Sequence, residues 1–471
     1  MSTLSARALA LLLSDWREQA TAAYQALADR IRLLVLDGRL PVGARLPAER
    51  ELAARLGISR TTVTAAYAEL RDAGYLSSVR GSGSVTRLPG PGPISIDPNV
   101  DGYLDFTKAA MPAVPGIVDA AARAIEELPG YLGDTGFDPL GIPVLREAIA
   151  RRYTARGLPT EPNQIMVTIG AQHAIALLAR TLIGRGDSAI VEAPTYPHAY
   201  EALRVAGARL VPVSVTTEHG WDEAALEQAI QRSSPALAYL MPDFHNPTGR
   251  SMSPEMRERV AQLAARHGTR IIADETMAEL AIDEAPSALP FAVTGDAITI
   301  GSVGKTVWGG IRVGWIRAEP ALIQKLARNR LSGDLGTPII EQLIVTQLLA
   351  DYDSILELRR LQLRDGRDHL VSALREALPE WSVPRAAGGL TTWVNLGAPV
   401  SSQLTLAARN EGLLITAGPR FGIDGAFERF MRVPHSYPRD ETDRAVAMLA
   451  RAWGSLARAP QEQADYFAVV V

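Results

Sequence analysis

Residues 301–315 read GSVGKTVWGGIRVGW, a glycine-rich and largely apolar stretch that contains a single lysine, Lys305. Ser302 lies three residues before this lysine and Arg312 seven after it, and the strand-like segment AITI precedes all of them. A lone lysine in a short motif is most often a solvated turn residue. Whether Lys305 does chemistry therefore depends on what the rest of the chain brings to it.

The composition indicates a chain with more than one domain. A chain of 471 residues is too long to fold around one hydrophobic core. Its content of 47% hydrophobic and 21% charged residues is ordinary for a globular protein. There is no cysteine, which excludes disulfides and thiolate nucleophiles, and the seven histidines show no metal-ligand spacing, so no metal is expected. LALLL at 9–13 is too short for a membrane span and no cleavage site follows, so we expect a cytoplasmic protein without a membrane partner.

Charge is unevenly distributed along the chain. Residues 24–88 contain ten arginines, no lysine and six acidic residues, so this segment carries +4 while the whole chain carries −4. A small basic module joined to an acidic body is typical of a chain in which one part contacts a polyanion.

The basic segment has the pattern of a winged helix-turn-helix. YQALADRIRLLVLDG, PAERELAARLG and SRTTVTAAYAELRDA have helical spacing, and YLSSVRGSGSVTRL predicts two short strands around Gly-Ser-Gly. The helix that Ser59 caps is predicted to enter the major groove of double-stranded DNA, where the residues of its first turn reach base edges, while Arg45, Arg50 and the wing contact phosphates. A small helical scaffold that binds protein is the alternative. The candidate DNA contacts are Arg45, Arg50, Ser59, Arg60, Thr61, Thr62, Arg80, Gly81 and Gly83.

After the Pro/Gly-rich linker LPGPGPISIDP, short β-branched runs alternate with Ala/Leu-rich helical stretches. This alternation predicts an α/β fold with a mainly parallel sheet and a site at the strand ends. The strand candidates are QIMVTI, SAIVEA, RLVPVSV, ALAYLMP, TRIIADE and AITIGS, and the helix candidates are AIALLARTLI, TYPHAYEALRVAG, WDEAALEQAI and PEMRERVAQLAARHG.

Polar residues follow these strands in an order that suits one cofactor. A pyridine aldehyde bearing a phosphate needs an amine for an imine, an anion for its ring nitrogen, an aromatic lid, a donor for its phenolic oxygen and a phosphate cradle. Small residues around Lys305 let such a ring approach the backbone. The candidates, in that order, are Lys305, Asp274, Tyr196, Asn246 and, for the phosphate, Gly170, Ala171, Gln172, Ser302 and Arg312.

Two stretches carry family resemblances. GARLPAERELAARLGISRTTVTAAYAELRDAGYL resembles the GntR family of winged helix-turn-helix regulators, and the ordered segments GAQ, HNPTG, DE, GSVGK and GIRVGW resemble the fold-type I pyridoxal-phosphate aminotransferases. The combination resembles the MocR family of transcription regulators. The expected organisation is a DNA-binding domain over 17–88, a linker over 89–104 and an aminotransferase-like body over 105–455, with its large part at about 105–345 and its smaller α+β part at about 365–455.

The MocR resemblance implies a homodimer that binds pyridoxal 5'-phosphate as an imine with Lys305. That cofactor, or an amine or amino-acid effector whose carboxylate Arg432 would bind, alters binding to a DNA operator. The chain departs from the aminotransferase pattern at two places. In that pattern a tyrosine follows the aspartate, but here the position falls on Thr276 or Met277. Near the start of the body, Phe137 lies close to where relatives often have a tyrosine. We therefore expect weak or partial transamination. An active aminotransferase with a DNA-binding extension and a cofactor-free dimerisation platform are the alternatives.

Overall fold

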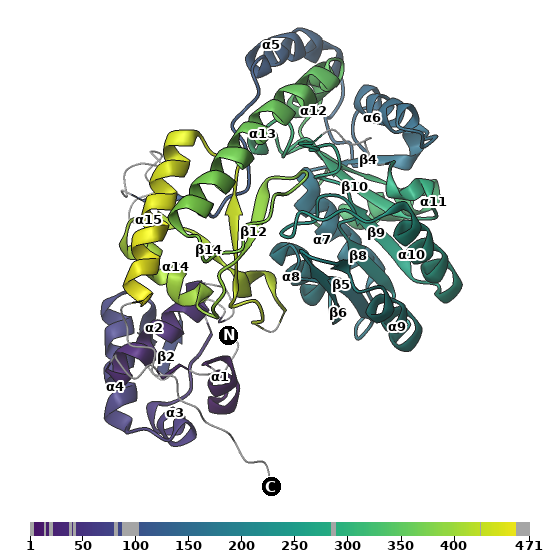
Figure 1. Cartoon of the computed structure of the whole chain (residues 1–471). Helices are drawn as coiled ribbons and strands as arrows, with labels where there is room; N and C mark the ends of the chain where they lie inside the picture. Colours follow the sequence, from purple (N-terminus) through teal and green to yellow (C-terminus); the bar gives the residue numbers. More distant parts are fainter. Residues whose placement is uncertain are drawn as a thin grey trace.

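The computed structural model describes residues 4–13, 16–17, 22–36, 40, 44–79, 83–86, 103–283, 289–423 and 425–457. These residues form an N-terminal module, a large part built on one central sheet and a small part at the C-terminal end of the chain (Figure 1). The small part lies between the other two, with the N-terminal module next to α14 (Ser401–Asn410).

The N-terminal module consists of short helices followed by a two-stranded antiparallel hairpin, as the sequence predicts. Leu27, Ile31, Leu52 and Tyr67, from three different helices, are buried in one core, and this shared burial holds the helices together. Residues 80–82, between the two hairpin strands, lie outside the described part of the chain. The elements are α1 (Ala6–Leu13), α2 (Ala23–Leu36), α3 (Glu49–Leu56), α4 (Arg60–Asp72), β1 (Leu76–Val79) and β2 (Gly83–Thr86).

The turn between α3 and α4 is set by two residues. Gly57 ends α3 with φ at 67°, a left-handed conformation that glycine adopts without a Cβ penalty. Ser59 caps α4, since its Oγ accepts a hydrogen bond from the backbone N–H of Thr62 at 3.1 Å. The predicted cap of the second helix is therefore present.

The large part is built on an eight-stranded sheet in the order β4-β11-β10-β9-β8-β5-β6-β7. Strands β10, β9, β8, β5 and β6 run parallel, so their carboxyl ends meet at one edge of the sheet. The strands are β4 (Ile165–Thr168), β5 (Ser188–Ala193), β6 (Arg209–Thr216), β7 (Gly220–Trp221), β8 (Leu237–Leu240), β9 (Arg270–Asp274), β10 (Ile298–Ser302) and β11 (Gly314–Arg317).

Strand β11 was not among the predicted strands. It pairs antiparallel with both β10 and β4. Strand β4, which is the predicted strand QIMVTI, therefore joins the sheet only through β11. Its Trp315 packs on Gly301, where an added Cβ would lie 2.3 Å from the indole ring. Four residues that follow a glycine-rich loop carry too short an apolar pattern to be distinguished as a strand.

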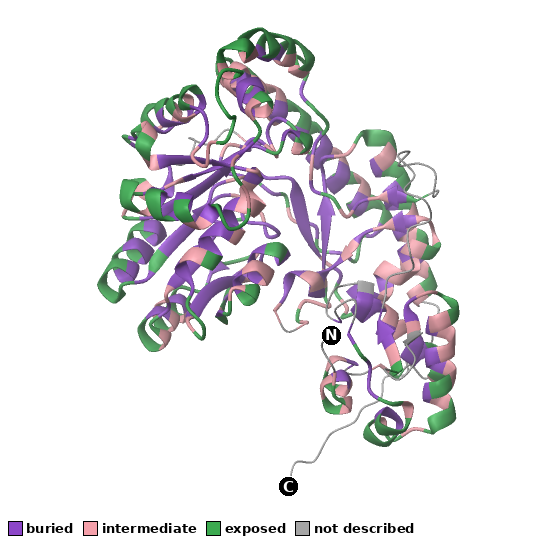
Figure 2. Cartoon of the chain, turned by 180° about the vertical axis from the view of Figure 1, so that it is seen from behind, coloured by how far each residue is buried: buried purple, intermediate pink, exposed green. Residues whose placement is uncertain are grey.

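Helices cover both faces of this sheet, and Figure 2 shows the strands buried and the outer helix surfaces exposed. Alternate residues of each strand face opposite layers: Val191 packs in the cluster with α7, α8 and α11, whereas Ile190 packs with α9 and α10. The helices are α5 (Ile117–Glu127), η1 (Leu128–Tyr131), α6 (Pro143–Ala155), η2 (Pro162–Gln164), α7 (Gly170–Leu182), α8 (Pro197–Val205), α9 (Glu223–Ser233), α10 (Pro254–His267), η3 (Phe291–Val293), η4 (Gly309–Ile311), α11 (Pro320–Arg330) and α12 (Ile339–Leu349).

The small part is entered by the long helix α13 (Tyr352–Ala377) and combines a three-stranded sheet, β12-β15-β14, with helices. The short strand β3 (Leu104–Asp105), which opens the body in sequence, pairs in parallel with β13 of this part. The remaining elements are β12 (Thr391–Asn395), α14, β13 (Leu413–Leu414), β14 (Thr416–Ala417), η5 (Gly418–Phe421), β15 (Phe430–Pro434) and α15 (Arg439–Ala457).

An ion pair joins the N-terminal module to the small part. Arg30 on α2 lies 3.3 Å from Glu428, and its Nε also donates to the carbonyl of Leu13 at 3.1 Å. Both charged side chains are mostly buried, with 17% and 22% of their surface exposed, so water screens this pair less than a surface pair. Within the described residues, no helix is long and apolar enough to cross a membrane.

Candidate functional site

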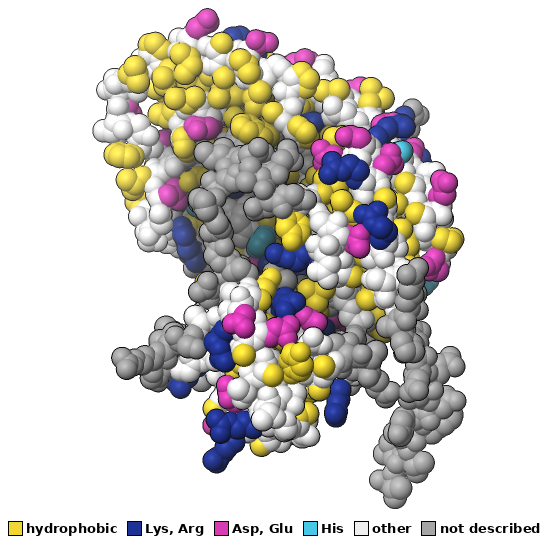
Figure 3. Space-filling view, turned by 90° about the vertical axis from the view of Figure 1, so that its left-hand side faces the viewer, with side chains coloured by type: hydrophobic (Ala, Val, Ile, Leu, Met, Phe, Trp, Pro, Cys, Tyr) yellow, Lys and Arg dark blue, Asp and Glu magenta, His cyan; other side chains and the backbone are white. Residues whose placement is uncertain are grey.

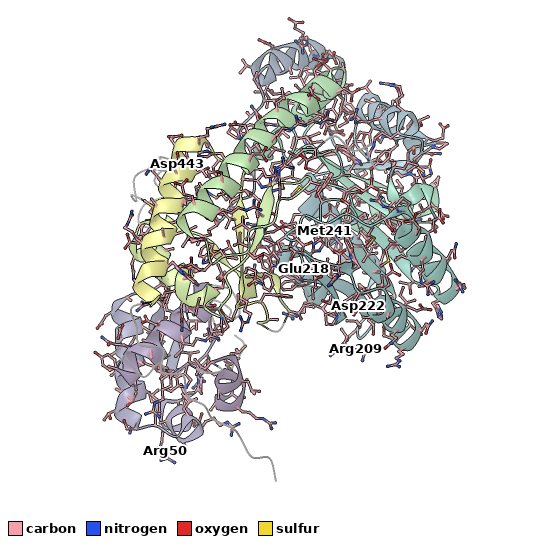
Figure 4. All side chains as sticks on the ribbon, in the orientation of Figure 1. Arg50, Arg209, Glu218, Asp222, Met241 and Asp443 are labelled. Atoms are coloured by element: carbon pink, nitrogen blue, oxygen red, sulfur yellow. The ribbon has the colours of Figure 1, made fainter. Side chains whose placement is uncertain are left out.

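A cavity of about 550 Å³ lies where the carboxyl ends of the parallel strands face the small part. Met241, which follows β8 and lines this cavity, is labelled in Figure 4 on the side of the large part that faces the small part. The volume is in the range of small-molecule and cofactor sites. Nearly all of the predicted cofactor residues line it, namely Ala171, Gln172, Tyr196, Asn246, Asp274, Ser302, Lys305 and Arg312, as does the predicted effector residue Arg432.

Lys305 follows β10 and is half-buried in the cavity wall. Its Nζ donates a hydrogen bond to the carbonyl of Ala109 at 2.6 Å. Burial, and then the positive charge of Arg432, lower the pKa of Lys305 to about 8, while the negative charge of Asp274 opposes this shift. About one fifth of the amine is therefore neutral and nucleophilic at pH 7.4, far more than for an ordinary lysine.

Asp274 ends β9 and is held by two hydrogen bonds. Its Oδ2 accepts from the hydroxyl of Tyr239 and its Oδ1 from the backbone N–H of Thr276, at 3.0 Å for the latter. Burial raises the pKa of Asp274, and the Tyr239 and Thr276 hydrogen bonds oppose that rise. A buried carboxylate fixed in this way is suited to face a cationic ring nitrogen.

Tyr239 was not predicted as a site residue. It lies on β8, in the otherwise aliphatic segment ALAYLM, and its ring is buried in the core beneath the sheet. A hydroxyl in such a strand needs a buried partner, and this requirement is the signal in the sequence that points to it.

Asn246 and Tyr196 lie on neighbouring parts of the cavity wall. Asn246 is buried, and its Oδ1 has no hydrogen-bond partner among the described residues. Tyr196 precedes α8, and its ring meets His198 edge to face with the ring centroids 5.3 Å apart. A buried amide oxygen without a partner is rare in proteins, and a ligand that completes its hydrogen bonding would explain it.

The predicted anion end of the cavity is formed at the start of α7. Arg312 lies over Gly170, where an added Cβ would come within 2.7 Å of the guanidinium, and it donates to the carbonyl of Ile169 at 3.2 Å. Gly170 thus lies behind Arg312 and does not itself line the cavity. Ser302 Oγ donates to the Val313 carbonyl at 3.1 Å. Arg312 has no carboxylate partner among the described residues, so its charge remains available to an anion.

Arg432 on β15 faces the cavity from the small part. Its guanidinium donates to the Thr107 carbonyl, stacks over the Phe421 ring at 4.8 Å, and leaves its Nε without a partner among the described residues. Burial lowers its pKa to about 10. Arg420, which also lines the cavity and was not predicted, is instead neutralised by Glu201 at 2.7 Å.

The two departures from the aminotransferase pattern lie in different places. Thr276 and Met277 both line the cavity, so neither position supplies there the phenol of the expected tyrosine. Phe137 is 68% exposed and is not part of this cavity.

Most of the predicted DNA contacts have described positions in the N-terminal module. Arg60 is 69% exposed on the first turn of α4, and Arg45 lies beside Gly83 of the hairpin, where an added Cβ would be 3.7 Å from its Nε. Ser59 is occupied as the helix cap, with Thr61 and Thr62 hydroxyls 2.8 Å from its Oγ. Arg80 and Gly81 lie outside the described residues.

Figure 3 shows several basic side chains on this module, interspersed with acidic ones, and Arg50 is labelled at its far end from the body in Figure 4. The excess of arginines over acidic residues in residues 24–88 is the electrostatic pattern of a nucleic-acid-binding module.

Comparison with known families gives two matches. Residues 110–449 match the family "Aminotransferase class I and II", and residues 23–85 match "Bacterial regulatory proteins, gntR family". The chain belongs to the class I and II aminotransferase family, and its N-terminal module is of the GntR type. The expected fusion of a GntR-type module to an aminotransferase-like body, as in MocR proteins, is confirmed.

Individual relatives include both enzymes and regulators. The chain is 30% identical to the 2-aminoadipate transaminase of Thermus thermophilus over 71% of this chain and 85% of that protein. It is 28% identical to the HTH-type transcriptional regulator YdcR of Escherichia coli and 25% identical to YisV of Bacillus subtilis, each over 91% of this chain and over 98% and 95% of the relative. The aminotransferase LysN of Thermus thermophilus, solved with N-(5'-phosphopyridoxyl)-L-leucine, superposes with a TM-score of 0.69 at 28% identity, over 76% of this chain and 94% of LysN.

The family's cofactor is pyridoxal 5'-phosphate, as the sequence predicts, and the residues present fit it. The cavity holds an amine of lowered pKa, a fixed carboxylate, a buried amide without a partner and an uncommitted arginine next to the start of a helix. When bound, this cofactor supplies an electrophilic carbonyl and a ring that withdraws electrons. The chain would hold it through Lys305, Asp274, Asn246, Tyr196, Ser302 and Arg312.

The lowered pKa of Lys305 leads to a first prediction. In cofactor-free protein, we expect the rate at which an amine-selective reagent labels Lys305, followed by mass spectrometry, to rise through about pH 8 instead of near the usual value of 10.5. Arg432→Gln removes a positive charge that disfavours the protonated amine, so the midpoint should move upward. Arg420→Gln is the control, because Glu201 already neutralises Arg420. Equal midpoints in all three proteins would contradict this assignment.

Proposed function

We propose that this protein is a DNA-binding transcription regulator of the MocR type that senses pyridoxal 5'-phosphate, or an amino compound that reacts with it, in the aminotransferase-like body. The observation that carries the proposal is the presence, in one chain, of a GntR-type module and a cavity that nearly all of the expected cofactor residues line. We assign residues 17–88 to DNA binding, 89–104 to the linker and 105–455 to the sensor. We also propose that the protein acts in the cytoplasm, as a regulator of the bacterial gntR type that binds DNA would.

The effector we propose is a free amine or amino acid, or the cofactor itself. Arg432 supports a carboxylate, because its guanidinium is buried, faces the cavity and has no acidic partner among the described residues. A bidentate contact from a carboxylate would compensate the burial of this charge.

The second candidate function is an active aminotransferase. The 30% identity to a transaminase favours it, while the replacement of the expected tyrosine by Thr276 or Met277 disfavours it, since a phenol next to the amine helps control proton transfer there. Repeated turnover with an amino acid and an oxo-acid acceptor would establish the enzyme. A single slow half-reaction would leave the regulator as the better assignment.

The surface near α5 and α12 supports a homodimer. Figure 3 shows hydrophobic side chains gathered at the top of the molecule, where Figure 1 places these helices. Contiguous apolar surface of this kind marks protein–protein contact, and we assign it to a second copy of the chain. The exposed apolar residues of this region are Val118, Ile125, Leu132 and Ile340.

Regulation further requires that the cavity and the DNA-binding module be linked. The segment from Gly418 to Phe430 contacts both: Phe421 lines the cavity, and Glu428 pairs with Arg30 of the module. Glu428 also accepts from the backbone N–H and the hydroxyl of Ser402 at 2.9 and 2.8 Å, so it is fixed within the small part. We propose that a ligand in the cavity acts on DNA binding through this segment, by stabilising one arrangement of the two parts.

Lys305→Ala tests the sensor. We expect the variant to lose the yellow chromophore and the borohydride-stable cofactor label, and to bind its own upstream DNA identically with and without added cofactor, while the wild type responds. Binding is measured by fluorescence anisotropy on footprinted DNA. A cofactor response retained in the variant would favour a different sensing site, and no response in either protein would favour the dimerisation platform.

Arg60→Ala and Arg45→Ala separate the two kinds of DNA contact. Arg60, at the exposed start of α4, should contribute to base recognition, so its loss should cost about 1–3 kcal/mol on the operator and relax sequence preference. Arg45, beside the hairpin, should contribute to phosphate binding, so its loss should weaken binding to all sequences and lower the salt slope by about one. Identical salt slopes and unchanged discrimination would contradict these roles.

Arg30→Gln tests the link between the parts. It removes the ion pair but leaves the Glu428–Ser402 contacts, so we expect near-normal DNA affinity without cofactor and a smaller cofactor-induced change. The control is Arg32→Gln, because Arg32 pairs with Asp29 and Glu69 inside the module. A full response in Arg30→Gln would show that the link lies elsewhere.

A further inference from the structure

Arg359 is a buried arginine without a counter-ion. It lies on α13, is 1% exposed, and has no acidic partner among the described residues. Among the described residues, the other two arginines that are completely buried are Arg330 and Arg367, and each pairs with a carboxylate, of Asp334 and Asp283 respectively. An unpaired buried guanidinium is expensive to desolvate, so it persists only where its hydrogen bonds have a specific use.

All but one of the hydrogen bonds of Arg359 go to main-chain carbonyls. Its Nε donates to Thr306 at 2.7 Å, and its Nη2 donates to Val307 at 2.8 Å and to Pro112 at 2.6 Å. The remaining bond, from Nη1, goes to the side chain of Gln362 one turn along the same helix, at 2.9 Å. The planar fork thus joins two separate stretches of backbone.

These two stretches are the ones that orient Lys305. Thr306 and Val307 directly follow the lysine, and Pro112 lies three residues after Ala109, whose carbonyl accepts the lysine Nζ at 2.6 Å. Arg359 therefore fixes both the backbone segment that carries the Lys305 amine and the backbone segment that accepts the hydrogen bond of this amine.

Helix α13 has a second contact with this loop. The hydroxyl of Tyr352, the first residue of α13, lies 2.6 Å from Thr306 Oγ1. Tyr352 packs in a core of the large part, whereas Leu370 and Leu374, later on the same helix, pack in the core of the small part. The helix is continuous between them, so a change in the orientation of the small part reaches the loop through a rigid element.

We propose that Arg359 is a positioning residue that fixes the backbone on both sides of the Lys305 amine and thereby couples the orientation of this amine to helix α13. This inference rests on the proposed function only in taking Lys305 as the reactive group. Without the hydrogen bonds of Arg359 to these backbone carbonyls, the Lys305 amine would leave the Ala109 carbonyl and become hydrated. The pKa of Lys305 would then return toward the ordinary value.

The test is the pH dependence of Lys305 labelling in cofactor-free protein, which requires neither cofactor nor DNA. We expect Arg359→Gln to raise the labelling midpoint above about 8 and to lower the rate at neutral pH by about threefold or more, the change that half a pKa unit produces. Arg359→Lys keeps the charge but lacks the fork, so it should restore the midpoint only in part. The control is Arg360→Gln, at a more exposed neighbour that pairs with Glu357, and it should behave as wild type.

Tyr352→Phe keeps the proposal testable if Arg359→Gln does not fold. It removes only the hydroxyl that contacts Thr306, and it should raise the midpoint in the same direction by a smaller amount. A wild-type midpoint in folded Arg359→Gln, or in Tyr352→Phe where Arg359→Gln cannot be obtained, would overturn the proposal. A further outcome is that the midpoint shifts in Arg359→Gln while DNA binding by the wild type never responds to cofactor. That result would support this inference and contradict the proposed function.

Discussion

The site depends on the electrostatic environment of one half-buried amine, that of Lys305, which lies near the positive charge of Arg432 and the negative charge of Asp274. Lys305 is close enough to Arg432 and Asp274 for both charges to act on its pKa, and burial makes the largest contribution to lowering that pKa. Each of these three residues comes from a different strand or strand end, and Arg432 belongs to the small part. The reactivity of the amine is therefore a property of how the two parts of the body are arranged.

Much of the fold follows from local pattern. The predicted strands end in polar residues, and since parallel strands share one carboxyl edge, Asn246, Asp274 and Lys305 had to lie near one another. Strand β11 escaped prediction because four residues next to glycines carry little periodic signal. The helix-turn-helix was predictable because Gly57 and Ser59 mark the turn in sequence as well as in structure.

The residues that sequence did not reveal are those whose role lies in long-range contacts. Tyr239 supports Asp274 from a neighbouring strand, Arg420 is neutralised by Glu201 far away in the chain, and Arg359 binds carbonyls that no side-chain pattern encodes. A buried tyrosine or arginine in a sequence indicates that a partner exists. It does not say which partner, because that is decided by tertiary packing.

The segment that opens the body has an unusual share of these contacts. Within a few residues after β3, the carbonyls of Thr107, Ala109 and Pro112 accept from Arg432, Lys305 and Arg359 in turn. A protease cut just after this segment would leave the sheet and its helices whole while removing the acceptors of all three cations. A fragment that began at the main sheet would therefore lack these three acceptors and the strand that pairs with β13. A shortened body needs the residues from Leu104 onward to keep them.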